Sequence, residues 1–330
     1  MMEDLKIGIT EAGVMHTDAD APFDLETRFR MVSESGVYDY YDKTPPLEEE
    51  AAYADLSAKY DLPVLAGGWF YQLGKDEDLL RSNLELGARL GSKVHNTQIF
   101  WRHAKGRPVT DEEVMEIYLM ANEWGDVCGC TPTFEVHINM WSEDFRRVVQ
   151  VADMVETRGV PFRMTLDHSH VIFKMNNEAE SKMFGLAEAL ADGSLILDPG
   201  MPGNVCDEWI NRGFVCHAHA RAAVPNNPRN TFAEDHKGRP GRGVQYPFLQ
   251  PADGEYVAAW DENSLAPWKQ VVRNLLVYRS TSGDENMQTI STEFIPFPDY
   301  GGGHKYSIWE NSLACARWIR QESEAFTPDG

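Results

Sequence analysis

The sequence lacks any long apolar run, since no stretch reaches the roughly 18 residues that a membrane-spanning helix needs. It begins MMEDLKIGIT, with acidic residues where a secretory signal peptide would carry basic residues followed by apolar ones. We therefore expect a cytoplasmic protein that has no membrane partner.

Basic residues are also scarce. The chain has 30 Lys and Arg against 52 Asp and Glu, which gives a formal net charge of -22, and the basic residues form no long run. Such a surface repels phosphate backbones and anionic headgroups. Nucleic acid is therefore not expected as a partner.

Cysteine is sparse and odd in number, so the five cysteines cannot all pair within one chain. A reducing cytosol would keep them as thiols. Cys128 and Cys130 form CGC, which has neither the CxxC spacing nor a second half-site. We expect these two residues to pack at a helix end rather than to bind zinc.

What the sequence does contain is a regular alternation of β-branched apolar runs with amphipathic runs. Eight such alternations predict a single (β/α)₈ TIM barrel domain over residues 1–330, and the 42% hydrophobic content is enough for one large core. The expected strands are 6–15, 36–42, 62–71, 92–100, 131–138, 160–170, 212–220 and 287–297. The expected helices are 25–35, 47–60, 76–91, 111–129, 143–159, 180–193, 264–280 and 311–326.

A long segment after the seventh strand, from about 221 to 260, shows no clear periodicity and is rich in Pro, Asn, Gly and Arg. Structureless insertions of this length inside a compact domain are uncommon and are usually lids or binding loops. We expect this segment to be a long loop beside the site.

Four residues suited to bind a metal stand at the ends of the last four expected strands: Glu135, Asp167, His219 and Glu293. In a (β/α)₈ barrel the C-terminal ends of the strands carry the active site. A single buried acid there is often structural, but four potential ligands at the same level of the barrel favour a shared functional site. Carboxylate oxygens with one imidazole suit one divalent ion, which could be Mn, Mg, Co or Zn.

The order of these residues resembles a known superfamily. A glutamate is followed by DHSH at 167–170, by HAH at 217–219 and by a glutamate on the last strand. This order is similar to that of the xylose isomerase-like TIM barrels, and among them to ketose 3-epimerases, inosose dehydratases and hydroxypyruvate isomerases. The resemblance covers nearly the whole chain in architecture, but its specific residues are confined to strands five to eight.

The resemblance implies a sugar isomerase or epimerase that acts on an unphosphorylated ketose or keto-polyol. Glu135, Asp167, His219 and Glu293 would bind the metal, and Glu135 and Glu293 would also be the acid/base pair on opposite faces of the sugar. The reaction would pass through a metal-stabilised enediolate. Dimers or tetramers are frequent in the family, although the residues of this chain identify no interface.

Further residues are expected to bind the small-molecule substrate. By resemblance, His170 would donate to a sugar oxygen, and it could equally orient Asp167. His217 shares the inward face with His219. Arg221 lies two residues beyond His219 and competes with Arg229 for contact with a substrate carboxylate or hydroxyl.

Two residues in the first half of the chain complete the predicted site. Trp69 and Asn96 stand at the tips of strands three and four, where stacking on a sugar face and recognition of hydroxyls are expected. Packing at the rim would explain them equally well.

His137, two residues after Glu135, is a candidate general base that the epimerase pattern does not require. It keeps a second activity open, a metal-dependent lyase or dehydratase of a keto-sugar or keto-glycoside, like the C-glycoside deglycosidases of the same superfamily. Sugar binding without catalysis is the remaining alternative.

Overall fold

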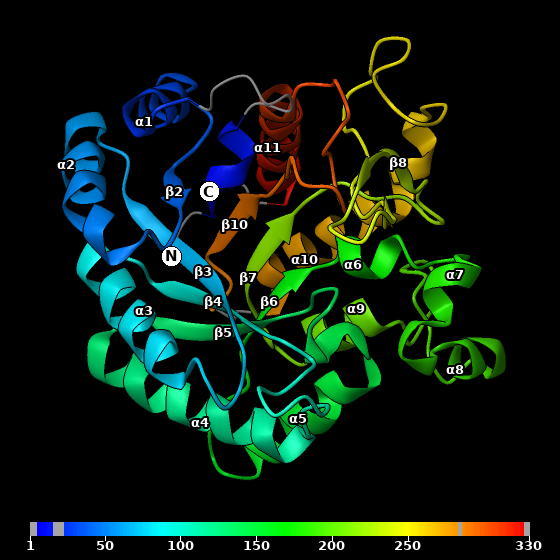
Figure 1. The fold of residues 1–330 in the computed structure, drawn as a ribbon, viewed down its shortest axis with the longest axis horizontal. Helices are drawn as coiled ribbons and strands as arrows, with labels where there is room; N and C mark the ends of the chain where they lie inside the picture. Colours follow the sequence, from blue (N-terminus) through cyan, green and yellow to red (C-terminus); the bar gives the residue numbers. More distant parts are fainter. Residues whose placement is uncertain (1–4, 16–22, 283–285, 327–330) are drawn as a thin grey trace.

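Eight parallel strands close into a barrel in the order β1-β2-β3-β4-β5-β6-β7-β10, with β10 next to β1 (Figure 1). The computed structural model describes residues 5–15, 23–282 and 286–326. The barrel strands are β1 (Lys6–Thr10), β2 (Tyr40–Asp42), β3 (Val64–Tyr71), β4 (Val94–Ile99), β5 (Thr131–Glu135), β6 (Met164–Asp167), β7 (Val215–Ala220) and β10 (Thr289–Thr292). The predicted (β/α)₈ barrel is confirmed.

Helices surround the barrel and cover the outer face of its strands (Figure 1). The long helices are α1 (Leu25–Glu34), α2 (Glu50–Tyr60), α3 (Glu77–Leu90), α4 (Asp111–Cys128), α5 (Arg146–Glu156), α10 (Ala266–Ser282) and α11 (Ile308–Ala325). Local chemistry sets several ends: Asp24 caps α1, Thr110 and Glu113 form a capping box on α4, and Gly91 ends α3 with φ +99°. None of the described helices has the length and apolar composition needed to cross a membrane.

The expected helix over 180–193 is wrong, because the chain breaks within it. It forms α7 (Glu178–Ser181), a 3₁₀ turn η4 (Met183–Gly185) and α8 (Ala187–Asp192), which project from the barrel (Figure 1). Phe184 at φ +55° and Gly185 at φ +65° cannot continue a right-handed helix. The element that precedes β7 is instead α9 (Val205–Asn211).

Four expected strands, the first, fifth, sixth and eighth, also end earlier than their apolar patterns indicate. After β1 the chain turns into a 3₁₀ helix, η1 (Glu11–Val14), and after β6 it turns into α6 (Ser169–Ile172). Ser142, just before the expected fifth helix, lies in η3 (Trp141–Glu143), and its hydroxyl donates to the Glu135 carbonyl at 2.5 Å. The hydroxyl therefore holds the end of β5 in place.

The segment after β7 is irregular except for a short antiparallel pair, β8 (Asn230–Glu234) with β9 (Pro240–Gly241), and a 3₁₀ turn η5 (Glu262–Leu265) before α10. The Asn230 amide donates to the Pro298 carbonyl at 3.0 Å, and the Asp299 carboxylate accepts from the backbone N–H of Arg242 at 2.9 Å. The segment is thus bound to the loop that follows β10, at the end of the barrel where the strands terminate.

Candidate active site

The strand register places the predicted ligands at one level of the barrel. Asp167 on β6 is paired with His219 on β7, and His219 is paired with Ser291 on β10. Because residues two apart share a face, Asp167 and His219 point inward above Thr165 and His217. The polar layer below them is closed by hydrogen bonds, including one of 2.9 Å between His217 Nδ1 and Thr289 Oγ1.

The four predicted ligand residues do converge. Glu135, Asp167, His219 and Glu293 are buried, and each offers a ligand atom such that all four atoms lie within 4.8 Å of one another. Nδ1 of His219 lies 3.0 Å from Glu135 Oε1 and 3.3 Å from Glu293 Oε2. Four separate strands therefore deliver three carboxylates and one imidazole to one small volume.

Amide side chains from β4 hold one oxygen of Glu135. Asn96 Nδ2 donates to Glu135 Oε2 at 2.7 Å, and Gln98 Nε2 donates to the same oxygen. The other oxygen, Oε1, faces His219. Asn96, which we predicted to contact the substrate, therefore also orients the Glu135 carboxylate.

Arg221 is fully buried and contacts the ligand carboxylates rather than an open surface. Its guanidinium pairs with Asp167 and, at 2.8 Å, with Glu293 Oε2, and it donates to His170 Nε2 at 2.8 Å. The Tyr300 ring covers it, with 4.4 Å between the Arg221 Cζ atom and the ring centroid. The structure thus places Arg221 where it orients two carboxylates, and places its competitor Arg229 away from this cluster, beside residues 177–182 and 226–228.

The electrostatics of the cluster favour a bound cation. Three carboxylates face one guanidinium and the His219 ring, so even a protonated His219 leaves one negative charge uncompensated. Burial works to lower the pKa of His219, but Glu293 and Glu135 outweigh it and raise that pKa well above its usual value. Carboxylate oxygens and an imidazole that bind a proton this tightly are also suited to bind a divalent ion instead of the proton.

The two glutamates differ in environment. Burial alone would raise the pKa of Glu135, but His219 lowers it to about 2. For Glu293 burial prevails over His219 and Arg221, so its pKa lies above its ordinary value. Carboxylates whose pKa values are driven apart are the pattern of an acid/base pair.

Asp42 is the site residue that sequence reasoning missed. It ends β2, and its Oδ2 lies 3.3 Å from His217 Nε2 and 3.6 Å from His219 Nε2, in a second group of buried ligand types. Ser291 Oγ donates to the same oxygen at 2.5 Å. The sequence carries a signal for it, because Asp42 closes the second expected strand, 36–42, much as Glu135 closes β5.

A cavity of about 300 Å³ opens onto this cluster. Among the predicted residues, Trp69, Asn96, His219 and Glu293 line it, and so does Asp42. The described lining does not include His217 or His170. His217 hydrogen-bonds Thr289 through Nδ1, and its Nε2 lies 3.3 Å from Asp42 Oδ2. His170 Nε2 lies 3.1 Å from Asp167. Their geometry favours orientation of the ligands, which is the second role considered for His170.

His137 lies close to the cluster but is engaged on both ring nitrogens. Its Nδ1 donates to the Ile138 carbonyl at 2.6 Å, and its Nε2 is 3.0 Å from the Tyr300 hydroxyl. Burial lowers its pKa despite the nearby Glu135, so the ring is neutral. To act as a base it would have to exchange its bond with Tyr300.

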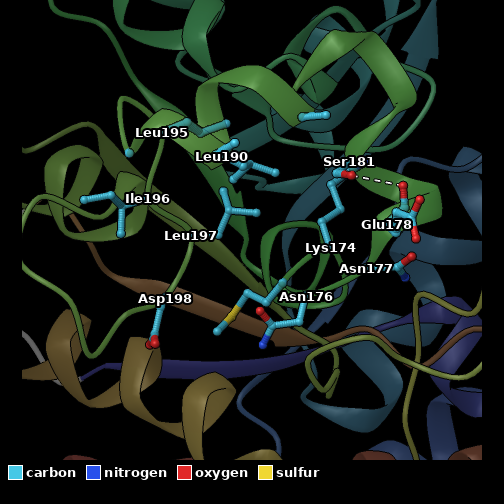
Figure 2. Close-up of a pocket in the computed structure, with 14 residues that line it drawn as sticks. Lys174, Asn176, Asn177, Glu178, Ser181, Leu190, Leu195, Ile196, Leu197 and Asp198 are labelled. Carbon is cyan, nitrogen blue, oxygen red and sulfur yellow. Dashed lines mark hydrogen bonds between the residues drawn. The ribbon is translucent and has the colours of Figure 1, made fainter.

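A second hollow, of about 510 Å³, lies apart from this cluster between residues 174–181 and 187–198 (Figure 2). Leucines and Ile196 form its apolar wall, with Asn176, Glu178 and Asp198 around it (Figure 2). Its described lining contains none of the predicted site residues.

The fold and the buried carboxylate–histidine cluster define a (β/α)₈ barrel with a candidate metal centre at the C-terminal ends of its strands. Comparison of the sequence with protein-family models and with curated proteins gave no match. Solved structures, by contrast, are similar over nearly the whole chain.

Three of them illustrate the similarity of fold. D-allulose 3-epimerase from Methylomonas sp. is 15% identical with a TM-score of 0.54, over 97% of this chain and 98% of that one. A 3-keto-D-glucoside 4-epimerase from E. coli is 15% identical, with a TM-score of 0.52 over 96% and 100%. A xylose isomerase domain protein from Alicyclobacillus acidocaldarius is 13% identical, with a TM-score of 0.56 over 97% and 99%. The fold of this chain is that of the xylose isomerase-like TIM barrels, as the resemblance implied.

Proposed function

We propose that this protein is a divalent-metal-dependent isomerase or epimerase of an unphosphorylated ketose or keto-polyol. The observation that carries the proposal is the convergence of four buried ligand types, two of them glutamates within 3.3 Å of the same imidazole nitrogen. The similar solved structures that are named as sugar epimerases support it.

Glu135, Asp167, His219 and Glu293 would hold the ion. When bound, a divalent cation supplies Lewis-acid polarisation of a carbonyl oxygen, which acidifies the neighbouring C–H bond. Arg221, which is not among the described lining residues of the cavity, keeps Asp167 and Glu293 in position.

The two glutamates would move the proton. Glu135 is held through Oε2 by Asn96 and Gln98, and its Oε1 lies 3.0 Å from His219 Nδ1. Oε1 would take the proton from substrate carbon after exchanging this contact. Glu293, which lines the cavity, would return a proton to the opposite face or to the adjacent carbon. Removal and return by different carboxylates is what inversion of a carbon centre requires.

The charge of the cavity favours a neutral substrate. Its described lining carries the carboxylates of Glu11, Asp42 and Glu293 against one ammonium, that of Lys43, and Lys43 is already paired with Glu11 at 3.1 Å. A phosphate group would be repelled by this lining. A sugar or polyol that presents hydroxyls and a carbonyl fits it better.

Elimination is the second candidate, favoured by the neutral His137 beside His170, with 4.2 Å between the ring centroids. The same carboxylates would remove the first proton, and His137 would assist loss of a β-leaving group. The two activities differ in their products, since elimination releases a group and epimerisation keeps every atom of the carbon skeleton and its substituents.

The proposal is tested by metal analysis of the purified protein, followed by solvent deuterium incorporation into ketoses, inososes and keto-glycosides with product identification. We expect chelation to stop incorporation and added Mn²⁺, Mg²⁺, Co²⁺ or Zn²⁺ to restore it. Metal at about 100 times its Kd should also stabilise the fold by about 2.7 kcal/mol. Absence of incorporation in the metal-loaded protein, with every panel member, would contradict the proposal.

Asp42→Asn is expected to weaken divalent metal binding by a factor of roughly 10 to 100, because a carboxylate behind a metal-binding histidine orients the ring and raises its basicity. Titration calorimetry with Mn²⁺ measures the change without any need for turnover. The matched control is Asp55→Asn, on the exposed face of α2. Wild-type affinity in folded Asp42→Asn would show that Asp42 does not support His219.

A further inference from the structure

The cavity that opens onto the metal-ligand cluster has two dissimilar ends. One end is polar and is formed by His219 and Glu293 of the cluster together with Asp42, Asn96 and Gln98. The other end is apolar and is formed by Met15, Trp69, Phe70, Ile295 and Phe297. The mechanism proposed above uses only the polar end.

The apolar end is exposed to a degree that is unusual for aromatic side chains. Trp69 is 39% exposed, Phe70 42% and Phe297 56%. Only one other Phe or Trp in the described residues, Phe232, is exposed to a comparable extent, at 51%, and the cavity lining does not include it. Exposed apolar surface gathered at one cavity marks a binding surface rather than chance.

The local structure explains how these side chains come to stand at the mouth. β3 has eight residues, whereas its pairing with β2 reaches only Ala66. Its last residues extend beyond that neighbour and pair only with β4, Trp69 with Thr97 and Phe70 with Gln98. The strand therefore carries two aromatic residues past the rim on the β2 side.

The aromatic side chains form a supported surface. The ring centroids of Trp69 and Phe70 are 5.0 Å apart, and those of Phe70 and Phe100 are 6.0 Å apart. Phe297 comes from the loop after β10, between Pro296 and Pro298, whose fixed φ angles restrict that backbone. Restricted aromatic surfaces bind apolar groups at a low cost in conformational entropy.

We propose that the substrate carries an apolar aromatic substituent next to its metal-binding keto-polyol part, and that Trp69, Phe70 and Phe297 bind this substituent. The inference rests on the proposed function, because it takes the polyol to lie on the carboxylate cluster. One sugar face can stack on one ring, but it leaves the other exposed rings in water. An aryl glycoside with a keto-polyol ring fills both ends of the cavity.

Binding of paired probes to the full-length, metal-loaded protein tests this inference. Phenyl and methyl β-D-glucopyranoside share one sugar and differ only in the group that would reach the apolar end. We expect the phenyl compound to bind about tenfold more tightly by titration calorimetry, as an aromatic contact of this kind supplies. Equal affinity for the two compounds would overturn the proposal.

Variants of the exposed aromatic residues test which side chains produce the preference for the phenyl compound. Phe297→Ala should reduce phenyl affinity several-fold and leave methyl affinity unchanged. Trp69→Ala should reduce phenyl affinity more than methyl affinity, because Trp69 is also a predicted contact of the sugar itself. Both variants remove exposed side chains that the core does not need. Phe232→Ala is the matched control, an exposed phenylalanine outside the cavity lining, and should change neither affinity. A phenyl preference that survives both cavity variants would overturn the assignment. The proposal would also be overturned if the wild-type protein were a dimer that Phe297→Ala converts to a monomer. In that case a second copy of the chain, and not a substrate group, would cover the exposed aromatic side chains.

The outcome can be separated from that of the proposed function. Glycoside affinity needs no turnover, so a phenyl preference without any solvent deuterium exchange would retain the apolar subsite and reject the isomerase. Exchange with free ketoses but no phenyl preference would retain the isomerase and reject the subsite.

Discussion

Glu135→Gln is expected to slow solvent deuterium exchange into substrate by a factor of roughly 10² to 10⁴, the contribution of a positioned general base. The amide keeps the size of the carboxylate and offers an oxygen, but it cannot accept the proton. Glu293→Gln should have an effect of the same order, because removal and return of the proton need both groups. Exchange measured by mass spectrometry or NMR gives the rate directly.

The controls separate proton transfer from loss of the metal. Metal content and Mn²⁺ affinity are measured for each variant, and exchange is compared at saturating metal. Glu48→Gln, an exposed glutamate in η2 (Leu47–Glu49), is the matched control and should behave as wild type. A folded, metal-saturated Glu135→Gln or Glu293→Gln variant that exchanges at the wild-type rate would remove that residue from the acid/base role.

Lys174→Met is expected to destabilise the fold by roughly 3 to 5 kcal/mol, the usual effect of breaking a buried ion pair from one side. The Lys174 side chain is fully buried, with Nζ 2.8 Å from Glu143 Oε1 and 3.1 Å from Glu180 Oε2. Arg242 pairs with the same two carboxylates but cannot replace the lost ammonium inside the network. Urea unfolding measures the change.

Lys182→Met is the matched control, because its ammonium also pairs with a glutamate, Glu178, at 2.7 Å, but both side chains are largely exposed. We expect no measurable change there. If Lys174→Met unfolds at the same urea concentration as Lys182→Met, the buried network contributes nothing to stability.

The network also sets a pH window. Burial alone would raise the pKa of Glu143, but Arg242 and Lys174 lower it from an ordinary 4.5 to about 2. A depressed folded-state pKa contributes stability that is complete above the ordinary value and is lost as pH falls toward the folded value. The difference in stability between wild type and Lys174→Met should therefore shrink between about pH 4.5 and 2.

This network joins parts of the chain that are distant in sequence. Glu143 follows β5, Lys174 and Glu180 follow β6, and Arg242 lies in the long segment after β7. The segment that we expected to be a loop beside the site is thus fixed to two other loops at the same end of the barrel. The sequence held no sign of this, because the four residues are separated by up to 99 positions.

The helix expected at 180–193 shows a limit of periodicity. Its residues have good helix propensity, yet Phe184 and Gly185 adopt positive φ and the chain turns. Intrinsic propensity is a weak preference that tertiary packing overrides. Leu186 on the far side of the turn is buried in the core, which a straight helix over this range would not require.

The sequence by itself determined the barrel and the four ligand types at its rim. Strands of period two and helices of period 3.6 are local properties, and the parallel order of eight units places every strand end on one face. From that, the convergence of Glu135, Asp167, His219 and Glu293 could be predicted before any coordinate was known.

Only the tertiary structure decided which neighbours these residues meet. Asp42 behind the histidines, Arg221 on the carboxylates and the aromatic tip of β3 over the cavity all depend on strand register and on how far each strand extends past the next. Register and overhang are set by packing across the closed barrel, between residues far apart in the chain. No local pattern in the sequence records them.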